Sequence, residues 1–504
     1  IGGGLSGLYA ARMLHEHLPP SNQRGGLYEG VLVLEAAQRL GGRVRSVEGL
    51  APYAVEAGAE FVHGAAHSLL RRQLQLAGVA TVERPWPDYY FFSAAGGGGG
   101  DDVPRGRMID REEAQEVVAI QRCHAMMAEL VAADGDVGAA ADDERDRSVA
   151  QELRRRGGGD AATMGLAEAC YANDFGCSLR QLGLREARAE AARWVYGEEY
   201  LVPQQPLSSL VAHLARGLRT LLGWEARSVR LLLPAAAASG GDGGADARGG
   251  DEEGQEEEEE EAAAAVVEVV SADGRVVRAE YVVVAVPLTT LQRGFLSFSP
   301  PLSGAKRAAL RRVRVGNALK LIVSFTARFW APSFFDAVCV GTLFPELWVT
   351  ERAAAPSAEC SADTRAPAHG GVASMTFFVA GEAASAIAQQ KEADLLRGAL
   401  AQLDELFPPS SALNVLGRRP ADLYAAHLLV NWEDERFAFA GYSHPSLEAA
   451  GAREHLAAPH AAGRVHFAGE ATHPGVNPCM QAAMETGMRA AMQILQRTVP
   501  AAKL

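Results

Sequence analysis

Short apolar runs and helical patterns alternate along the chain. Residues 31–34 and 281–286 are apolar runs of strand length, and the second is followed by a proline. Runs of this kind predict strands that are buried on both faces of a sheet. The apolar positions of residues 8–17 and 480–496 recur at helical spacing. Together these elements predict an α/β fold.

The middle of the chain predicts a mixed sheet accompanied by helices. The expected helices are residues 110–133, residues 161–196 with breaks, and the amphipathic segment 392–407. The expected strands are residues 315–325, 343–350 and 372–379. Residues 134–160 are polar and rich in glycine, so we expect them at the surface.

A hairpin is predicted between residues 229–233 and 266–270. The segment 235–265 interrupts it and consists mainly of Ala, Gly and Glu, which is typical of a low-complexity acidic insertion. A regulatory or partner-binding segment is the alternative. A second turn follows at residues 271–275, where Asp273 and Gly274 supply the positive φ angles of a tight hairpin turn.

Charge and cysteine usage exclude several classes of function. The net charge of −14 argues against binding through nucleic-acid phosphates. Residues 251–261 hold nine acidic groups and no basic one, so the remainder of the chain is near −5. The sequence has no apolar run of about 20 residues, so we predict no membrane span. The six cysteines lack metal-ligand spacing, so we predict no metal site and a reducing compartment.

The first seven residues carry the spacing G-x-G-x-x-G at Gly2, Gly4 and Gly7. In dinucleotide-binding folds the first glycine makes a tight turn, the second lets the backbone approach a pyrophosphate, and the third lets a helix pack on a strand. The helix N-terminus then faces the phosphates. Glu35, at the end of the next predicted strand, is expected to bind ribose hydroxyls, with residues 19–30 as a longer loop before it.

Three further stretches indicate which dinucleotide binds. Residues 39–43 (Arg-Leu-Gly-Gly-Arg) follow Glu35, residues 282–287 form a strand ending in proline, and residues 467–472 (Phe-Ala-Gly-Glu-Ala-Thr) precede the last predicted helix. In this order they resemble the FAD-dependent amine oxidase superfamily over nearly the whole chain. That group includes monoamine oxidases, polyamine oxidases, L-amino-acid oxidases and lysine-specific histone demethylases, and the chain looks most like polyamine oxidases.

The resemblance implies a two-domain α/β flavoprotein. The Rossmann-like FAD-binding domain would be discontinuous and comprise residues 1–70, 205–295 and 415–504. The substrate domain, a mixed sheet plus helices, would comprise residues 71–204 and 296–414. The length of 504 residues agrees with two domains.

The resemblance also assigns residues to the cofactor FAD. Besides the glycine motif and Glu35, the expected binding residues are Gly42, Arg43, Val229 against the adenine, Trp432 near the isoalloxazine ring, Gly469 and Glu470. For Trp432, ordinary core packing is the alternative. Monoamine oxidases hold their flavin covalently through a Cys just before the position of Tyr442, and here that residue is Gly441. We therefore expect FAD to bind non-covalently.

Lys320 is the one charged residue of the apolar run 315–325. Because burying an unpaired ammonium is costly, Lys320 needs a partner. In the family the lysine at this place holds a water against flavin N5, so Lys320 is the expected catalytic residue. The alternative is a lysine at a strand end that reaches solvent.

Four residues are expected to bind the substrate by the same resemblance. Glu60 and His63 belong to the stretch 56–64 that lines the family's substrate cavity, and they are candidates for outer contacts to a cationic amine. A loop histidine bonded to the backbone is the alternative for His63. Tyr442 would form one wall of an aromatic cage, and an aromatic face attracts a cation. Cys479 stands where the second wall is usually aromatic, which puts the two-sided cage in doubt.

The function implied is FAD-dependent oxidation of a polyamine-like amine to an imine, which water converts to an aldehyde. Oxygen would accept the electrons and leave as hydrogen peroxide, so the expected partners are a small cationic amine and O2. The alternatives are a lysine-specific histone demethylase-like protein, an L-amino-acid oxidase, and a catalytically weak flavoprotein, the last suggested by Cys479.

Both ends of the sequence carry expectations. The chain lacks an initiator Met and the strand that should precede Gly2, which predicts a truncated chain. At the other end, Ala502-Lys503-Leu504 is similar to the peroxisomal address Ser-Lys-Leu. We therefore expect a peroxisomal import receptor as a partner and a peroxisomal location, with the cytoplasm as the alternative.

Overall fold

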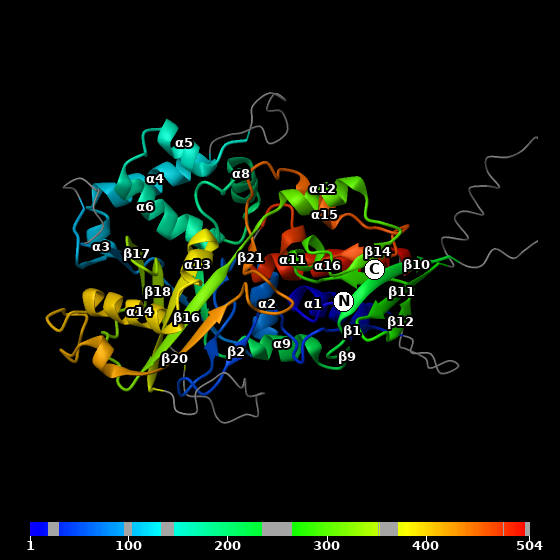
Figure 1. The fold of residues 1–504 in the computed structure, drawn as a ribbon, viewed down its shortest axis with the longest axis horizontal. Coiled ribbons are helices and arrows are strands. Elements are labelled where there is room, and N and C mark those ends of the chain that lie inside the picture. The colour runs from blue at the N-terminus through cyan, green and yellow to red at the C-terminus, as the bar shows by residue number, and fades with distance from the viewer. Residues whose placement is uncertain are drawn as a thin grey trace, which may run out of the picture.

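The computed structural model describes residues 1–18, 30–94, 103–132, 146–233, 265–350, 352, 371–476 and 478–498. Its elements form two groups side by side along the longest axis (Figure 1). The predicted insertion, apart from Ala265, and the tripeptide Ala502-Lys503-Leu504 lie outside the described residues. The nature of the insertion and the peroxisomal location stay predictions.

The first group holds the glycine motif and a parallel sheet. Its elements are α1 (Leu5–His17), β1 (Leu32–Leu34), α9 (Ser208–Ala215), β9 (Arg219–Leu221), β13 (Val282–Val284), α11 (Leu288–Gln292), α12 (Gly304–Arg312), α15 (Ala452–Ala457), β22 (Val465–Phe467) and α16 (Met480–Thr498). Strand β1 pairs with β9 and β13 with β22, both in parallel. Gly2 N donates to Leu34 O at 2.8 Å and Ala285 N to Ile1 O at 2.8 Å, so residues 1 and 2 link the two pairs.

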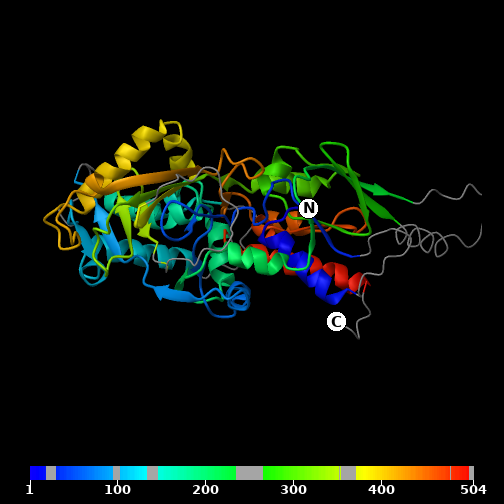
Figure 2. The same cartoon turned by 90° about the horizontal axis from the view of Figure 1, so that it is seen from below.

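Helices α1 and α16 come from opposite ends of the sequence and lie against each other (Figure 2). Their contact buries Ala10 and Leu14 of α1 against Ile494 and Leu495 of α16. The backbones approach so closely at Gly487 that a Cβ there would clash with the carbonyl of Ser6. The apolar spacing that predicted both helices therefore forms this contact.

The predicted hairpin is confirmed as part of a four-stranded sheet in the same group. The strand order is β12 (Val276–Ala279), β11 (Val266–Ser271), β10 (Ala226–Leu232) and β14 (Ser297–Ser299). Strands β10 and β11 are antiparallel, with Leu232 opposite Val266 at the point where the insertion leaves the sheet. Strands β11 and β12 are antiparallel around the predicted turn, where Gly274 has a φ of +84°.

The second group is built on a seven-stranded mixed sheet. Its order is β20 (Tyr424–Asn431), β16 (Ala318–Phe325), β19 (Ala373–Ala380), β18 (Glu346–Val349), β17 (Asp336–Val340), β6 (Tyr89–Phe92) and β7 (Met108–Asp110). Only the β17–β6 pair is parallel, so the predicted mixed sheet is confirmed among the described residues. Helix α14 (Glu392–Leu406) packs on it through its predicted apolar face, which includes Leu395, Leu403 and Leu406.

Helices cover one side of this sheet and correct two expectations. They are α3 (Arg111–Ala114), α4 (Val118–Ala132), α5 (Val149–Arg155), α6 (Ala161–Ala167), α7 (Asn173–Phe175) and α8 (Leu184–Arg193). Helix α13 (Gly381–Ile387) packs in the apolar cluster on the other side, with α14. The predicted helix 110–133 is broken between α3 and α4. The expectation of surface structure for residues 134–160 is wrong at α5, where Val149 and Leu153 are buried. A capping box between Ser148 and Gln151 starts this helix despite its polar surroundings.

Short elements connect the groups. They are β2 (Ser46–Val47), β3 (Val55–Glu56), β4 (Val62–His63), α2 (Leu69–Leu76), β5 (Thr81–Arg84), β8 (Tyr200–Pro203), β15 (Val315–Gly316) and β21 (Tyr442–Ser443). The proposed domain boundaries stay predictions. Two pairs of hydrogen-bonded strands join residues that the prediction assigned to different domains. Strand β14 pairs with β10, and β20 pairs with β16.

Candidate active site

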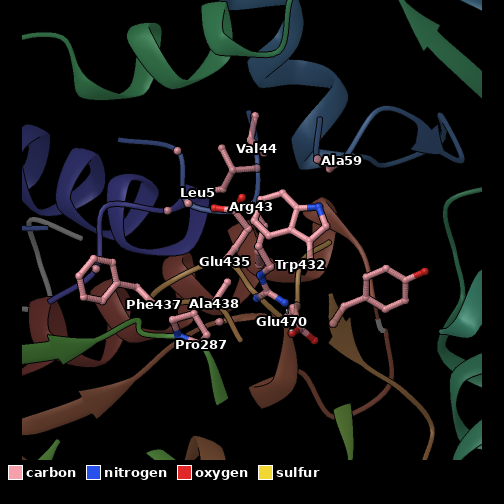
Figure 3. Close-up of a pocket in the computed structure, with 18 of the residues that line it drawn as sticks. Leu5, Arg43, Val44, Ala59, Pro287, Trp432, Glu435, Phe437, Ala438 and Glu470 are labelled. Atoms are coloured by element: carbon pink, nitrogen blue, oxygen red, sulfur yellow. Dashed lines mark hydrogen bonds and ion pairs between the residues drawn. The ribbon is translucent and has the colours of Figure 1, made fainter. Parts of the chain in front are cut away.

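A cavity of about 430 Å³ lies between the two groups and takes residues from both. Its size is in the range of small-molecule and cofactor sites. Leu5, Phe437, Ala438 and Pro287 lie around one end, and Trp432 lies beside Arg43 and above Glu470 (Figure 3). We call the part lined by the glycine motif and Glu35 the dinucleotide end, and the part lined by Lys320, Tyr442 and Glu346 the reaction end.

The glycine motif forms the dinucleotide end as its spacing predicts. Gly2 has a φ of +103°, a conformation that side chains rarely adopt. A Cβ at Gly7 would clash with the carbonyl of Gly2, so the third glycine permits the close approach of α1. Gly4 is the N-cap of α1 and lines the cavity with Leu5 and Ser6. The positive end of the helix dipole therefore faces the cavity, where a pyrophosphate would be stabilised.

Glu35 lines the same end and is buried. Its Oε2 accepts a hydrogen bond from Gly3 N at 2.6 Å, and its Oε1 accepts one from Ala37 N at 2.7 Å. These bonds hold the carboxylate next to the glycine turn. This position agrees with the predicted contact to ribose hydroxyls.

Arg43, Gly42, Gly469 and Glu470 all line the middle of the cavity. Arg43 Nη1 donates to Glu470 Oε1 at 2.9 Å and to Gly441 O at 2.8 Å. Gly469 has a φ of +122°, and its N–H donates to Thr486 Oγ1 of α16 at 2.9 Å. The stretches 39–43 and 467–472 thus meet through an ion pair, and Gly42 and Gly469 beside it line the cavity.

Val229, the residue expected against the adenine, is not among the residues that line the described cavity. Its side chain is 2% exposed and packs in the core of the four-stranded sheet. The cavity is lined instead by Ala226 and Arg227 of the same strand, together with Trp224 and Glu225 just before it. The side chain of Val229 packs against Val267 and Val269, and the expected contact of this strand with the adenine stays a prediction.

Trp432, Tyr442 and Cys479 line the cavity toward the reaction end. The indole of Trp432 is 4% exposed, and its Nε1 donates to Ala57 O at 3.0 Å. Tyr442 Oη donates to the backbone carbonyl of Asp174 at 3.2 Å, which fixes the ring against the cavity. Burial raises the pKa of the Cys479 thiol to about 12, so this wall of the cavity is neutral. Trp432 is buried in the core, which was the alternative expected for it, and it also faces the cavity.

Lys320 lines the reaction end and is 5% exposed, so the alternative of a solvent-reaching lysine is wrong. Its Nζ donates to Glu60 Oε2 at 2.8 Å and to the backbone carbonyl of Glu56 at 3.1 Å. The partner that the sequence required is thus Glu60. We expected Glu60 as an outer substrate contact, and the structure places its carboxylate on the lysine instead.

His63 lies at the same end, as expected, and its ring contacts Tyr200 edge to face at 5.3 Å between centroids. Its positive charge, when present, would lower the pKa of Asp174. Phe61 packs between Tyr200 and Trp348, with centroid distances of 4.7 and 5.0 Å. Aromatic side chains therefore form much of the wall here.

Two carboxyl groups at the reaction end were missed by the sequence reasoning. Asp174 is exposed to the cavity, and Glu346 is 6% exposed and lines it. Burial raises the pKa of Asp174. Burial and the charge of Asp174 raise the pKa of Glu346 to about 8, against the opposing hydrogen bonds from Trp86 Nε1 and Asn173 Nδ2. The sequence could have indicated Glu346, because it is a lone charge in an apolar strand, as Lys320 is. Nothing in the sequence singles out Asp174.

The arginines that line the described cavity lie away from these carboxyl groups and are engaged. Arg39 donates to the carbonyls of Leu40, Gly42 and Val44. Arg43 pairs with Glu470, while Arg227 and Arg436 pair with Glu225. Because Lys320 and Glu60 neutralise each other, Asp174 and Glu346 give the reaction end an acidic character.

These residues fit a flavin dinucleotide. The helix N-terminus fits the pyrophosphate, Glu35 fits the ribose, and the aromatic and apolar middle of the cavity fits a planar ring. Among the described residues, no group of three or more His, Cys, Asp or Glu side chains could hold a metal ion. No helix in the described part of the chain is long and apolar enough to cross a membrane.

Comparison with known proteins gives a family match over nearly the whole chain. The family model described as "Flavin containing amine oxidoreductase" matches residues 5–495. Among solved structures, a cyclohexylamine oxidase from Brevibacterium oxydans IH-35A has a TM-score of 0.70 at 19% identity and covers 99% of this chain and 98% of its own. A putrescine oxidase variant has a TM-score of 0.69 at 19% identity, with 98% of both chains covered. These likenesses show the fold.

Curated relatives match a shorter part of the chain. Lysine-specific histone demethylase 2 of Homo sapiens is 26% identical over 233 residues, which are 45% of this chain and 26% of the demethylase. Amine oxidase [flavin-containing] B of Cavia porcellus is 29% identical over 220 residues, which are 43% of this chain and 38% of the oxidase. The matches thus span between a quarter and two fifths of the length of these two relatives.

Proposed function

The chain belongs to the flavin-containing amine oxidoreductase family, and from this premise we propose that it oxidises a small amine that carries a second positive charge. The cofactor is FAD, held without a covalent bond. The electrons pass to O2, so hydrogen peroxide is a product. The oxidised amine is an imine, which water hydrolyses to an aldehyde and ammonia or a smaller amine.

One observation carries the choice of substrate. Glu346 and Asp174 both line the reaction end of the cavity, together with Trp432 and Tyr442. A carboxylate in a poorly solvated site is stabilised by a cation that pairs with it. A diamine or polyamine supplies such a cation at the end of the molecule that does not react. One of the solved structures with this fold is titled as putrescine oxidase bound to putrescine.

The residues of the chain position the amine and exclude water, and a bound flavin supplies the redox chemistry. Glu346 and Asp174 bind the distal ammonium. Tyr442 and Trp432 present aromatic faces to the nitrogen that reacts, where a cation or a polarised amine is favoured. Phe61, Trp348 and Tyr200 keep this end of the cavity apolar, which favours the neutral amine that loses a hydrogen.

The alternatives fit the cavity less well. An L-amino-acid substrate needs a cation for its carboxylate, and the cavity-lining arginines of the described chain are engaged with other groups of the protein. A histone demethylase-like function is favoured by the similarity to lysine-specific histone demethylases. A methylated lysine side chain is also a cationic amine, so this function remains a second candidate for the same cavity.

The test compares amines that differ in the second charge. Purified protein loaded with FAD is mixed with putrescine, spermidine, butylamine, L-amino acids and a peptide with dimethyl-lysine, and peroxide is followed. We expect putrescine or spermidine to have a kcat/KM at least tenfold above that of butylamine. Faster oxidation of butylamine, of an amino acid or of the peptide would overturn the proposed substrate class. Absence of peroxide with every amine would favour a catalytically weak flavoprotein.

A variant tests the observation itself. Glu346→Gln keeps the size of the side chain and one of its two acceptor oxygens, and it removes the charge. We expect it to raise the KM for putrescine at least tenfold while the KM for butylamine changes by less than threefold. Glu152→Gln is a matched control, because Glu152 is a buried carboxylate that pairs with Arg155 and Arg156 of the α5 region, outside the cavity lining.

A further inference from the structure

We propose that Glu60 is a positioning residue that holds Lys320 in an ion pair, and that this pair cancels the positive charge at the reaction end so that a cationic amine can bind beside the lysine. The inference rests on the proposed function for the identity of the amine. Its core, the dependence of the cavity's charge on Glu60, can be measured without any amine.

Lys320 and Glu60 are each held by contacts in addition to their ion pair. Lys320 Nζ lies 2.8 Å from Glu60 Oε2, and the two side chains are 6% and 3% exposed. The ammonium also donates to Glu56 O at 3.1 Å and lies 4.9 Å from the centre of the Trp348 ring. The other oxygen of Glu60 accepts from Thr350 Oγ1 at 3.4 Å. Each group is therefore held on several sides, which fixes the lysine in one position.

Glu56 is close to Lys320 but cannot replace Glu60 as its counter-charge. The side chain of Glu56 pairs with Arg352 at 2.9 Å and accepts from Ser46 Oγ and from Leu207 N. Only the backbone carbonyl of Glu56 reaches the ammonium. Because Glu56 and Arg352 neutralise each other, Glu60 is the carboxylate that neutralises Lys320.

The ion pair affects the binding of a cationic substrate because of the other charges at the reaction end. A substrate amine arrives as a cation, and an unpaired ammonium in a poorly solvated wall would repel it. The other ionisable groups that face this end are Asp174, Glu346, His63, Tyr200, Tyr442 and Cys479, and Glu60 also acts on the nearby Tyr53. With Lys320 neutralised, Asp174 and Glu346 attract the substrate without repulsion from the lysine. Glu60 thus acts on the amine through Lys320, which is a different role from the direct contact expected from the sequence.

The first measurement is the midpoint potential of the bound flavin in the full-length holoprotein. Glu60→Gln leaves an unpaired positive charge near the flavin-binding wall, and a positive charge favours the reduced, more negative flavin. We expect the potential to rise in Glu60→Gln and to return to the wild-type value in Glu60→Gln/Lys320→Met. Glu60→Asp, which keeps the charge, should stay near the wild-type value. Glu152→Gln, a buried carboxylate outside the cavity lining, should not change it.

The second measurement is the KM for putrescine in the same variants. Glu60→Gln is expected to raise this KM at least tenfold, with a smaller change in kcat. In the Lys320→Met background the same substitution should raise it less than threefold, because the charge that repels the amine is gone. An equal rise in both backgrounds would show that Glu60 contacts the amine directly and would overturn the proposal.

The two measurements distinguish a failure of the ion-pair proposal from a failure of the proposed function. If the wild-type protein oxidises no amine, the proposed function fails, while the potentials of the four variants still test the ion pair. An unchanged potential in Glu60→Gln overturns the pair as a neutralising device, whatever the enzyme oxidises. If Glu60→Gln does not fold, Glu60→Asp and the double variant supply the comparison, because in the double variant no charge is left unpaired.

Discussion

Asn173 Nδ2 donates to Glu346 Oε2 across 3.2 Å and thereby fixes a carboxyl group that faces the cavity. The amide is itself oriented, since its Oδ1 accepts from the backbone N–H of Ala380 at 2.8 Å. The other carboxyl oxygen accepts from Trp86 Nε1 at 3.2 Å. Glu346 is thus held in place at the point where Asp174 adds a second carboxyl group, and this arrangement makes its ionisation depend on pH near neutrality.

The first prediction concerns the pH dependence of substrate binding. The pKa of Glu346 is raised to about 8, so the group is mostly neutral at pH 7 and mostly charged at pH 9. The charged fraction rises from about a tenth to about nine tenths, while a distal ammonium with a pKa near 10.4 stays charged. We expect the KM of putrescine, relative to that of butylamine, to fall up to about tenfold between these pH values.

The control for this pH effect is the Glu346→Gln variant. It lacks the titrating group, so its ratio of KM values should be constant over the same range. A ratio that varies equally in the variant and the wild type would assign the titration to another group.

The second prediction concerns Lys320. We expect Lys320→Met to retain the flavin and to slow either its reduction by the amine or its reoxidation by oxygen at least tenfold, which is about 1.4 kcal/mol of barrier. The reason is the place of this buried ammonium at the reaction end. Stopped-flow mixing with amine and then with oxygen separates the two half-reactions. The exposed lysine in Lys391→Met serves as a control, and unchanged rate constants in Lys320→Met would contradict the role.

The third prediction concerns the attachment of the flavin. Residue 441 is a glycine, and a Cβ there would lie 2.6 Å from Cβ of Ala318 and 3.0 Å from its backbone N. The fold therefore leaves no room for a cysteine at this place. Acid precipitation is expected to release all the flavin into the supernatant, where its absorbance is measured. Colour that stays with the washed pellet would show a covalent bond.

The fourth prediction concerns the acidic insertion. Strands β10 and β11 are already paired at Leu232 and Val266, so a short turn can join them. Replacing residues 235–264 with Asn-Gly should leave turnover within twofold and leave the melting temperature unchanged or a few degrees higher, because a shorter loop costs less entropy to close. Ala265 is kept because it is buried, and removing it as well is expected to lower the melting temperature. A large loss of turnover in the first variant would show that the insertion is needed.

The parts of the site that could be predicted have strong local causes. The glycine spacing at residues 2–7 is dictated by a positive φ and two close backbone contacts, and those constraints leave few other sequences. Lys320 was identifiable because a lone charge in an apolar strand must have a partner. The helix α14 and the strands of the mixed sheet followed from their apolar periodicity.

The parts that could not be predicted depend on contacts between distant segments. Nothing local indicates that Glu60 pairs with Lys320, 260 residues away, because several acidic residues could have served. Asp174 belongs to a short helix, α7, that only the tertiary fold turns toward the cavity. The side chain of Val229 packs in the core of the four-stranded sheet, which depends on the pairing of β10 with β11. Predicting each of these features requires knowing which segments of the chain are in contact.

The packing of α1 on α16 also sets the order of events during synthesis. The ion pair between Arg43 and Glu470 joins residues that are 427 positions apart, and α16 follows it in the sequence. At ribosomal rates the later partner emerges roughly 20 to 90 s after the earlier one. During that interval the glycine turn exists without the wall that Glu470 completes, and the part of α1 that packs on α16 is uncovered. The described cavity can therefore enclose a dinucleotide only after both segments have been synthesised.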